Sequence, residues 1–134
     1  VFDYFLQVHG RESVDGRGGT LISVIHATSG GESMENAYWT GEMMVYGDGG
    51  SFFEPLAKAL DVAAHEFTHG VIEQTVNLEY RLESGALNES FADVLGAMVD
   101  REDWLMGEDV TITTAALRDL ETPENGDQPG HTPN

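Results

Sequence analysis

Two histidines and a glutamate form the most chemically suggestive group in this sequence. They occupy the pentapeptide H-E-F-T-H, residues 65–69. A helix turns about 100° per residue, so His65 and His69 lie on one face and can offer two imidazoles to one ion. Glu66 would lie beside that ion, where its carboxylate can take a proton from a water molecule. This spacing is typical of zinc sites that hydrolyse peptide bonds.

A catalytic zinc site needs a third protein ligand. Glu89 follows His69 by 20 residues, which is enough to end one helix, turn and return antiparallel on a second. Asp93, four residues later, would share the face of Glu89 and accept the outer N–H of a ligating histidine. The sequence therefore favours His65, His69 and Glu89 as a zinc set. The alternative is an ordinary amphipathic helix with two incidental histidines and solvated carboxylates.

Hydrophobic spacing predicts the helices that carry these residues. Apolar residues recur at steps of three and four over 55–77 and again over 84–99, which indicates two long helices. A shorter helix is expected over 2–9, ending at Gly10. Residues 121–134 hold three of the four prolines and are expected to form an extended tail.

The first half of the chain predicts a sheet. Strands are expected over 20–27, which is rich in β-branched residues, and over 36–47 as one or two strands. Loops or turns are expected at 12–19, 28–33 and 47–50. Because strands come first and long helices second, the expected class is α+β.

Composition limits the function classes. The 134 residues suffice for one domain. Acidic residues number 24 against 6 basic ones, a net charge of -18, which disfavours nucleic acid and anionic membranes as partners and suits cations.

No apolar run is long enough to span a membrane. The absence of cysteine excludes disulfides and a thiol nucleophile. Val1 is expected to be a processing or cloning boundary.

These features together resemble the thermolysin family of zinc metallopeptidases, whose pattern is H-E-x-x-H followed by E-x-x-x-D. The segments NAYW, MVYGDG, SGALNESFAD and GEDV also look like that family's, in its order, so the likeness covers nearly the whole chain. It implies a zincin-like α+β domain over 1–120, with an N-terminal sheet and two long antiparallel active-site helices. Residues 121–134 would then lead to a second, helical domain.

The resemblance implies roles for individual residues. His65, His69 and Glu89 would bind one zinc ion, with Glu66 as general base. Asp93 would orient His65, and Asn88 would support His69. Tyr80 would stabilise the tetrahedral oxyanion. Without the resemblance, we would expect Tyr80 to be an ordinary surface residue.

The resemblance also implies how a peptide substrate would be held. An edge strand containing Asn36, Ala37 and Tyr38 would pair with the substrate backbone. Arg118 would bind the carbonyl just beyond the scissile bond. Apolar side chains match the family's primary specificity pocket and imply cleavage on the amino side of hydrophobic residues; they are Phe53, Leu56, Val62, Met106, Val110 and Leu117. Core packing alone would also explain those six.

Four acidic residues resemble the family's calcium cluster, namely Asp61, Asp100, Asp103 and Glu108. Carboxylate oxygens suit calcium. However, the family has Glu where Asp100 stands, and Leu105 replaces another acidic ligand. One calcium ion is therefore expected.

Two hypotheses follow. The first is the zinc-bearing part of a secreted, extracellular endopeptidase that acts on peptides or proteins, with a C-terminal domain on the same precursor supplying further oxyanion donors. This chain stops at Asn134, before that region. The second is a truncated, hydrolytically weak or inactive zinc- and calcium-binding domain that acts as a fragment or interaction module.

Overall fold

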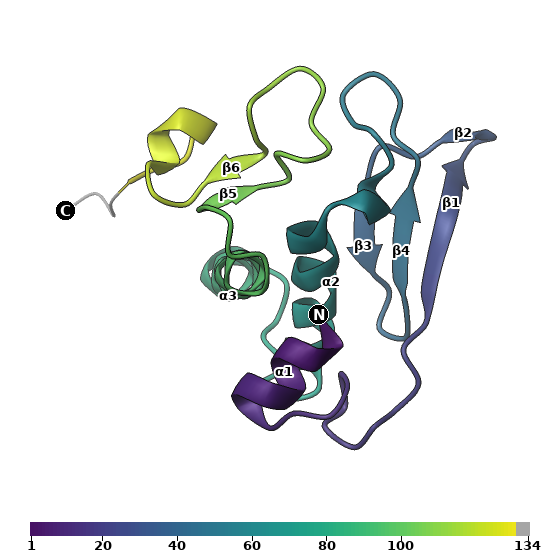
Figure 1. The fold of residues 1–134 in the computed structure, drawn as a ribbon, viewed down its shortest axis with the longest axis vertical. Coiled ribbons are helices and arrows are strands. Elements are labelled where there is room, and N and C mark those ends of the chain that lie inside the picture. The colour runs from purple at the N-terminus through teal and green to yellow at the C-terminus, as the bar shows by residue number, and fades with distance from the viewer. Residues whose placement is uncertain (131–134) are drawn as a thin grey trace.

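Helix α2 (Leu60–Glu73) lies at the centre of the computed structural model, which describes residues 1–130. A β-sheet lies on one side of α2 and helix α3 (Leu82–Val99) on the other (Figure 1). Because both neighbours cover it, α2 buries residues all round, including His65 and Glu66. This arrangement confirms an α+β fold with a small sheet followed by long helices.

The sheet has four strands in the order β2-β1-β4-β3. Their bounds are Ser23–Ser29 for β1, Glu32–Ser33 for β2, Ala37–Trp39 for β3 and Met44–Gly47 for β4. Strand β4 is buried throughout and pairs parallel to β1 and antiparallel to β3. Strand β3 therefore forms one edge of the sheet, and it packs against α2.

The predicted helix over 55–77 was wrong at both ends. Residues Leu56–Lys58 form a separate 3₁₀ turn, and Ala59 adopts an extended conformation that delays α2 until Leu60. Beyond Glu73 the chain turns, and Asn77 has a positive φ of 47°, which an α-helix does not accept. Helix α3 begins at Leu82, two residues before the expected position 84. Strand β1 begins at Ser23, three residues after the expected position 20.

The last third of the described chain holds elements that the sequence did not predict. Strands β5 (Leu105–Met106) and β6 (Arg118–Asp119) form a two-stranded antiparallel pair. A 3₁₀ helix, Pro123–Gly126, lies in the segment predicted to be extended. The rest of that prediction, residues 131–134, lies outside the described residues.

The two long helices cross. In Figure 1 helix α3 is seen end-on whereas α2 is seen from the side, so the expected antiparallel arrangement is not confirmed. Their contact is nevertheless the most extensive between any two elements. Among residues 1–130, no helix has both the length and the apolar character that crossing a membrane would require.

The core lies between α2, the sheet and helix α1 (Phe2–His9). The rings of Phe5 from α1 and Phe67 from α2 pack 4.7 Å apart, and both residues are almost fully buried. The other buried members of this cluster are Val14, Met44, Tyr46, Leu56, Ala59, Val62 and Val110. Phe67 is the middle residue of the pentapeptide, so this packing also fixes the rotation of α2 about its own axis.

We predict that Phe5→Ala will lower the free energy of unfolding by about 3–5 kcal/mol, because it removes a buried ring and leaves a cavity. Val8→Ala is the matched control: Val8 lies on the same helix but is 53% exposed, so its change should stay within about 0.5 kcal/mol. Urea unfolding followed by circular dichroism measures both. Equal effects for the two variants would contradict this description of the core.

Candidate active site

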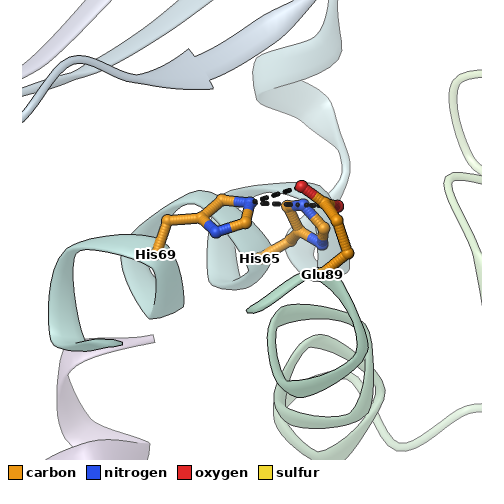
Figure 2. A group of neighbouring side chains, drawn as sticks. All are labelled: His65, His69 and Glu89. Atoms are coloured by element: carbon orange, nitrogen blue, oxygen red, sulfur yellow. Dashed lines mark hydrogen bonds and ion pairs between the residues drawn. The ribbon is translucent and has the colours of Figure 1, made fainter. Parts of the chain in front are cut away.

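The structure brings the three predicted zinc ligands together. Figure 2 shows His65 and His69 on α2 and Glu89 on α3 with their polar atoms directed toward one another. The two Nε2 atoms lie 2.9 Å apart. The carboxylate oxygens of Glu89 lie 3.2 Å from Nε2 of His65 and 3.4 Å from Nε2 of His69. Two imidazole nitrogens and a carboxylate thus surround one small volume.

The second ring nitrogen of each histidine, Nδ1, also contacts a side-chain oxygen. Nδ1 of His65 lies 2.8 Å from Oδ1 of Asp93, and Nδ1 of His69 lies 2.8 Å from Oδ1 of Asn88. Both Asn88 and Asp93 are buried. These contacts leave the Nε2 atoms facing inward, which is the support that metal-binding histidines ordinarily have.

The charges in this group stabilise one another. Burial alone would lower the pKa of His65, but Asp93 and Glu89 raise it to about 9. Burial would raise the pKa of Glu89, yet the two imidazoles hold it well below its usual range. Near neutral pH, a positive imidazole and a negative carboxylate therefore stabilise each other here.

Glu66 lies beside this group in a different electrostatic environment. It is buried, and burial raises its pKa even though His65 and His69 act in the opposite direction. A raised pKa brings a carboxylate closer to the range in which it can both accept and return a proton near neutral pH.

The two histidines, Glu66 and Glu89 line a cleft of about 760 Å³ between β3, α2 and the segment that leads into α3. Asn36, which precedes β3, and Ala37 and Tyr38 of β3 line it along the sheet edge. Five of the six predicted pocket residues also line it: Phe53, Leu56, Val62, Met106 and Leu117. Val110 does not. It is fully buried in the core, where its carbonyl accepts a hydrogen bond from the amide of Glu54.

Arg118 and Tyr80 both line the cleft, but they are held differently. Arg118, on β6, donates from Nε and Nη2 to the two oxygens of Asp93, each at 2.6 Å. Burial would lower the pKa of Arg118, and this carboxylate raises it. Tyr80 is 67% exposed on the loop between α2 and α3, and its ring lies edge-on to that of His69, 5.9 Å away.

The predicted calcium residues do not form one close group. Asp100 and Glu108 lie together, and the third carboxylate within ligand distance of both is Asp109. Asp61 is buried and accepts hydrogen bonds from the amides of Val62 and Gly107. Asp103 accepts one from the amide of Leu105 at 2.7 Å.

Sequence reasoning missed two acidic residues near these sites. Asp109 directly follows Glu108, and this pair of adjacent acids was the available signal. Glu73 lies one helical turn beyond His69, lines the cleft, and accepts a 2.6 Å hydrogen bond from the indole of Trp39. Its spacing of four from His69 placed it on the same helix face.

Two family models match the chain. The thermolysin metallopeptidase catalytic domain matches residues 1–73, and the thermolysin metallopeptidase alpha-helical domain matches residues 76–134. The division between them falls between α2 and α3, so His65 and His69 lie in the first match and Glu89, Asp93 and Arg118 in the second.

Curated relatives are similar over almost the whole chain. Bacillolysin of Bacillus amyloliquefaciens is 50% identical, covering 100% of this chain and 25% of its own length. Neutral protease NprE of Bacillus pumilus is 50% identical, covering 100% of this chain and 44% of its own. Extracellular elastase of Staphylococcus epidermidis is 50% identical, covering 98% of this chain and 27% of its own.

A solved structure agrees with these relatives. The precursor of protealysin, a metalloproteinase of Serratia proteamaculans, superimposes with a TM-score of 0.82 at 36% identity, covering 91% of this chain and 41% of that one. This chain thus spans less than half the length of the curated relatives named above. Both the motifs and the fold lead to one conclusion: the chain belongs to the thermolysin family of metallopeptidases.

Proposed function

We propose that this chain carries the zinc site of an endopeptidase that cleaves peptide bonds on the amino side of hydrophobic residues. The observation that carries the proposal is the convergence of His65, His69 and Glu89 from two helices, beside the buried carboxylate of Glu66. The open cleft along the sheet edge gives a peptide access to this point.

The donor set fits zinc. Two imidazoles and one carboxylate form a typical catalytic zinc set, which leaves a further position for water or substrate. The outer nitrogens of both histidines already have oxygen partners, so little reorganisation is needed to present the Nε2 atoms. When bound, zinc would polarise the scissile carbonyl and lower the pKa of a water molecule.

The remaining chemistry falls to the chain's own side chains. Glu66 takes a proton from the attacking water and delivers it to the leaving amine. Asp93 and Asn88 keep the two imidazoles in place. Tyr80, at the rim of the cleft, donates a hydrogen bond from its hydroxyl group to the oxyanion. Arg118 uses Nε and Nη2 on Asp93, which leaves Nη1 to donate to the substrate carbonyl beyond the scissile bond.

Substrate binding follows from the two walls of the cleft. The edge strand β3, through Ala37 and Tyr38 and together with the preceding Asn36, adds the substrate as a further strand. The apolar end takes the side chain just after the scissile bond; its residues are Phe53, Leu56, Val62, Met106 and Leu117. Cleavage on the amino side of hydrophobic residues results.

We also propose one bound calcium ion, a C-terminal domain on the same precursor and an extracellular location. The calcium ion binds at Asp100 and Glu108 with Asp109, and Asp61 and Asp103 organise the backbone around them. A C-terminal helical domain on the same precursor adds donors for the oxyanion after the unit formed by residues 1–120. The extracellular elastase among the relatives supports an extracellular location.

We predict that Glu89→Ala will weaken zinc binding by more than about a hundredfold, because it removes one of three ligands. Competition with a zinc-chelating dye measures the affinity. Glu83→Ala is the control, because Glu83 is an exposed carboxylate in the first turn of the same helix and should leave affinity unchanged. Unchanged affinity in the Glu89 variant would refute the ligand assignment.

We predict that Glu66→Gln will retain zinc and reduce hydrolysis of a peptide with Leu after the scissile bond by about 10²–10⁴-fold, because the proton acceptor is lost. Fluorescence from a quenched peptide measures the rate, with a chelator as blank. Hydrolysis at the wild-type rate would contradict the role of Glu66. Zinc binding without hydrolysis in the wild-type chain would favour the metal-binding module instead.

We predict that zinc binding at pH 7 will release about one proton from His65, because its metal-free pKa is raised to about 9 and the ligating imidazole must be neutral. Zinc affinity should therefore fall progressively as the pH drops below about 9. Calorimetry in buffers of different ionisation enthalpy measures the released protons. Proton release that is absent at pH 7 would contradict this electrostatic description.

A further inference from the structure

The cleft has two chemically different ends, and α2 runs between them. Val62 lies at the apolar end, the proposed catalytic residues His65, Glu66 and His69 lie in the middle, and Glu73 lies beyond them. A helix rises about 1.5 Å per residue, so Glu73 is roughly 9 Å along the axis from the midpoint of the two histidines. The order of these side chains along the cleft follows from the helix itself.

The carboxylate of Glu73 is fixed in position. Its Oε2 accepts the indole N–H of Trp39 at 2.6 Å, and Trp39 ends the edge strand β3. Its Oε1 borders Gly41, where an added Cβ would lie 3.7 Å away. Trp39 and Gly41 both line the cleft, so Glu73 is tied to the wall along which a peptide would run.

Glu73 has no ion-pair partner among residues 1–130. The ion pairs there involve other carboxylates, and Arg118, which also lines the cleft, is paired with Asp93 near the apolar end. Thr40, Asn77 and Glu79 also line the cleft, and none of them carries a positive charge. A cationic side chain entering this end would therefore meet a positioned, uncompensated carboxylate.

We propose that Glu73 is a specificity-determining residue that selects Lys or Arg two or three residues before the scissile bond. This inference rests on the proposed function, in which the apolar end holds the residue just after that bond. The preceding part of the peptide then runs along β3 toward Glu73. An extended chain advances about 3.3 Å per residue, so roughly 9 Å corresponds to the second or third residue.

The test uses the zinc-loaded chain and non-cleavable peptides. Each peptide carries a phosphonamidate in place of the scissile amide, Leu after it, and Lys, norleucine or Glu at the second and third positions before it. Fluorescence anisotropy of the labelled peptides gives Kd. The Lys peptide should bind about threefold to fivefold more tightly than the norleucine peptide, and the Glu peptide less tightly. The preference should shrink at high ionic strength.

Two variants separate the charge from the fold. Glu73→Gln keeps an oxygen for the Trp39 indole but removes the charge, so the Kd values of the Lys and norleucine peptides should become about equal. Glu42→Gln removes an equal charge from a nearby exposed residue that does not line the cleft, so the preference should remain.

The outcomes distinguish this inference from the proposed function. Equal binding of the Lys and norleucine peptides by the wild-type chain would overturn the inference alone. A preference that survives in Glu73→Gln would do the same. Absence of zinc-dependent binding for every peptide would overturn the proposed function, and the inference with it.

Discussion

The contact between His65 and Asp93 is the interaction on which the rest of the site depends. Asp93 is buried, and an ionised carboxylate in such a place is costly unless it is paired. It meets Nδ1 of His65 at 2.8 Å and the guanidinium of Arg118 at 2.6 Å. One side chain thus connects α2, α3 and β6. Because Glu89 lies one turn before Asp93 on α3, the same connection directs Glu89 toward the histidines.

The convergence of the site could be predicted because it follows from helix periodicity. Spacings of four place His65 with His69 and Glu89 with Asp93, and the linker length allows the two helices to meet. The crossing of the helices could not be predicted, since it depends on side-chain packing rather than on spacing. Nor could the break at Ala59 or the two-residue strands β5 and β6, which depend on contacts distant in sequence.

The residues of the cleft could likewise be predicted only in part from the sequence. Residues on one helix face were predictable as neighbours, whereas the bond between Trp39 and Glu73 joins positions 34 residues apart and depends on how β3 packs against α2. Val110 has the apolar character of a pocket residue, but the loop that carries it turns into the core. Composition alone could not separate these cases. The net charge of -18 likewise gave no sign that one carboxylate would be fixed at an end of the cleft.

The most direct test of the account is to locate zinc in crystals of the zinc-loaded chain by anomalous scattering at the zinc absorption edge. One strong peak is expected about 2.0–2.2 Å from Nε2 of His65, Nε2 of His69 and a carboxylate oxygen of Glu89, with Asp93 and Asn88 still in contact with the outer nitrogens. A peak elsewhere, or one that lacks Glu89 as a ligand, would contradict it.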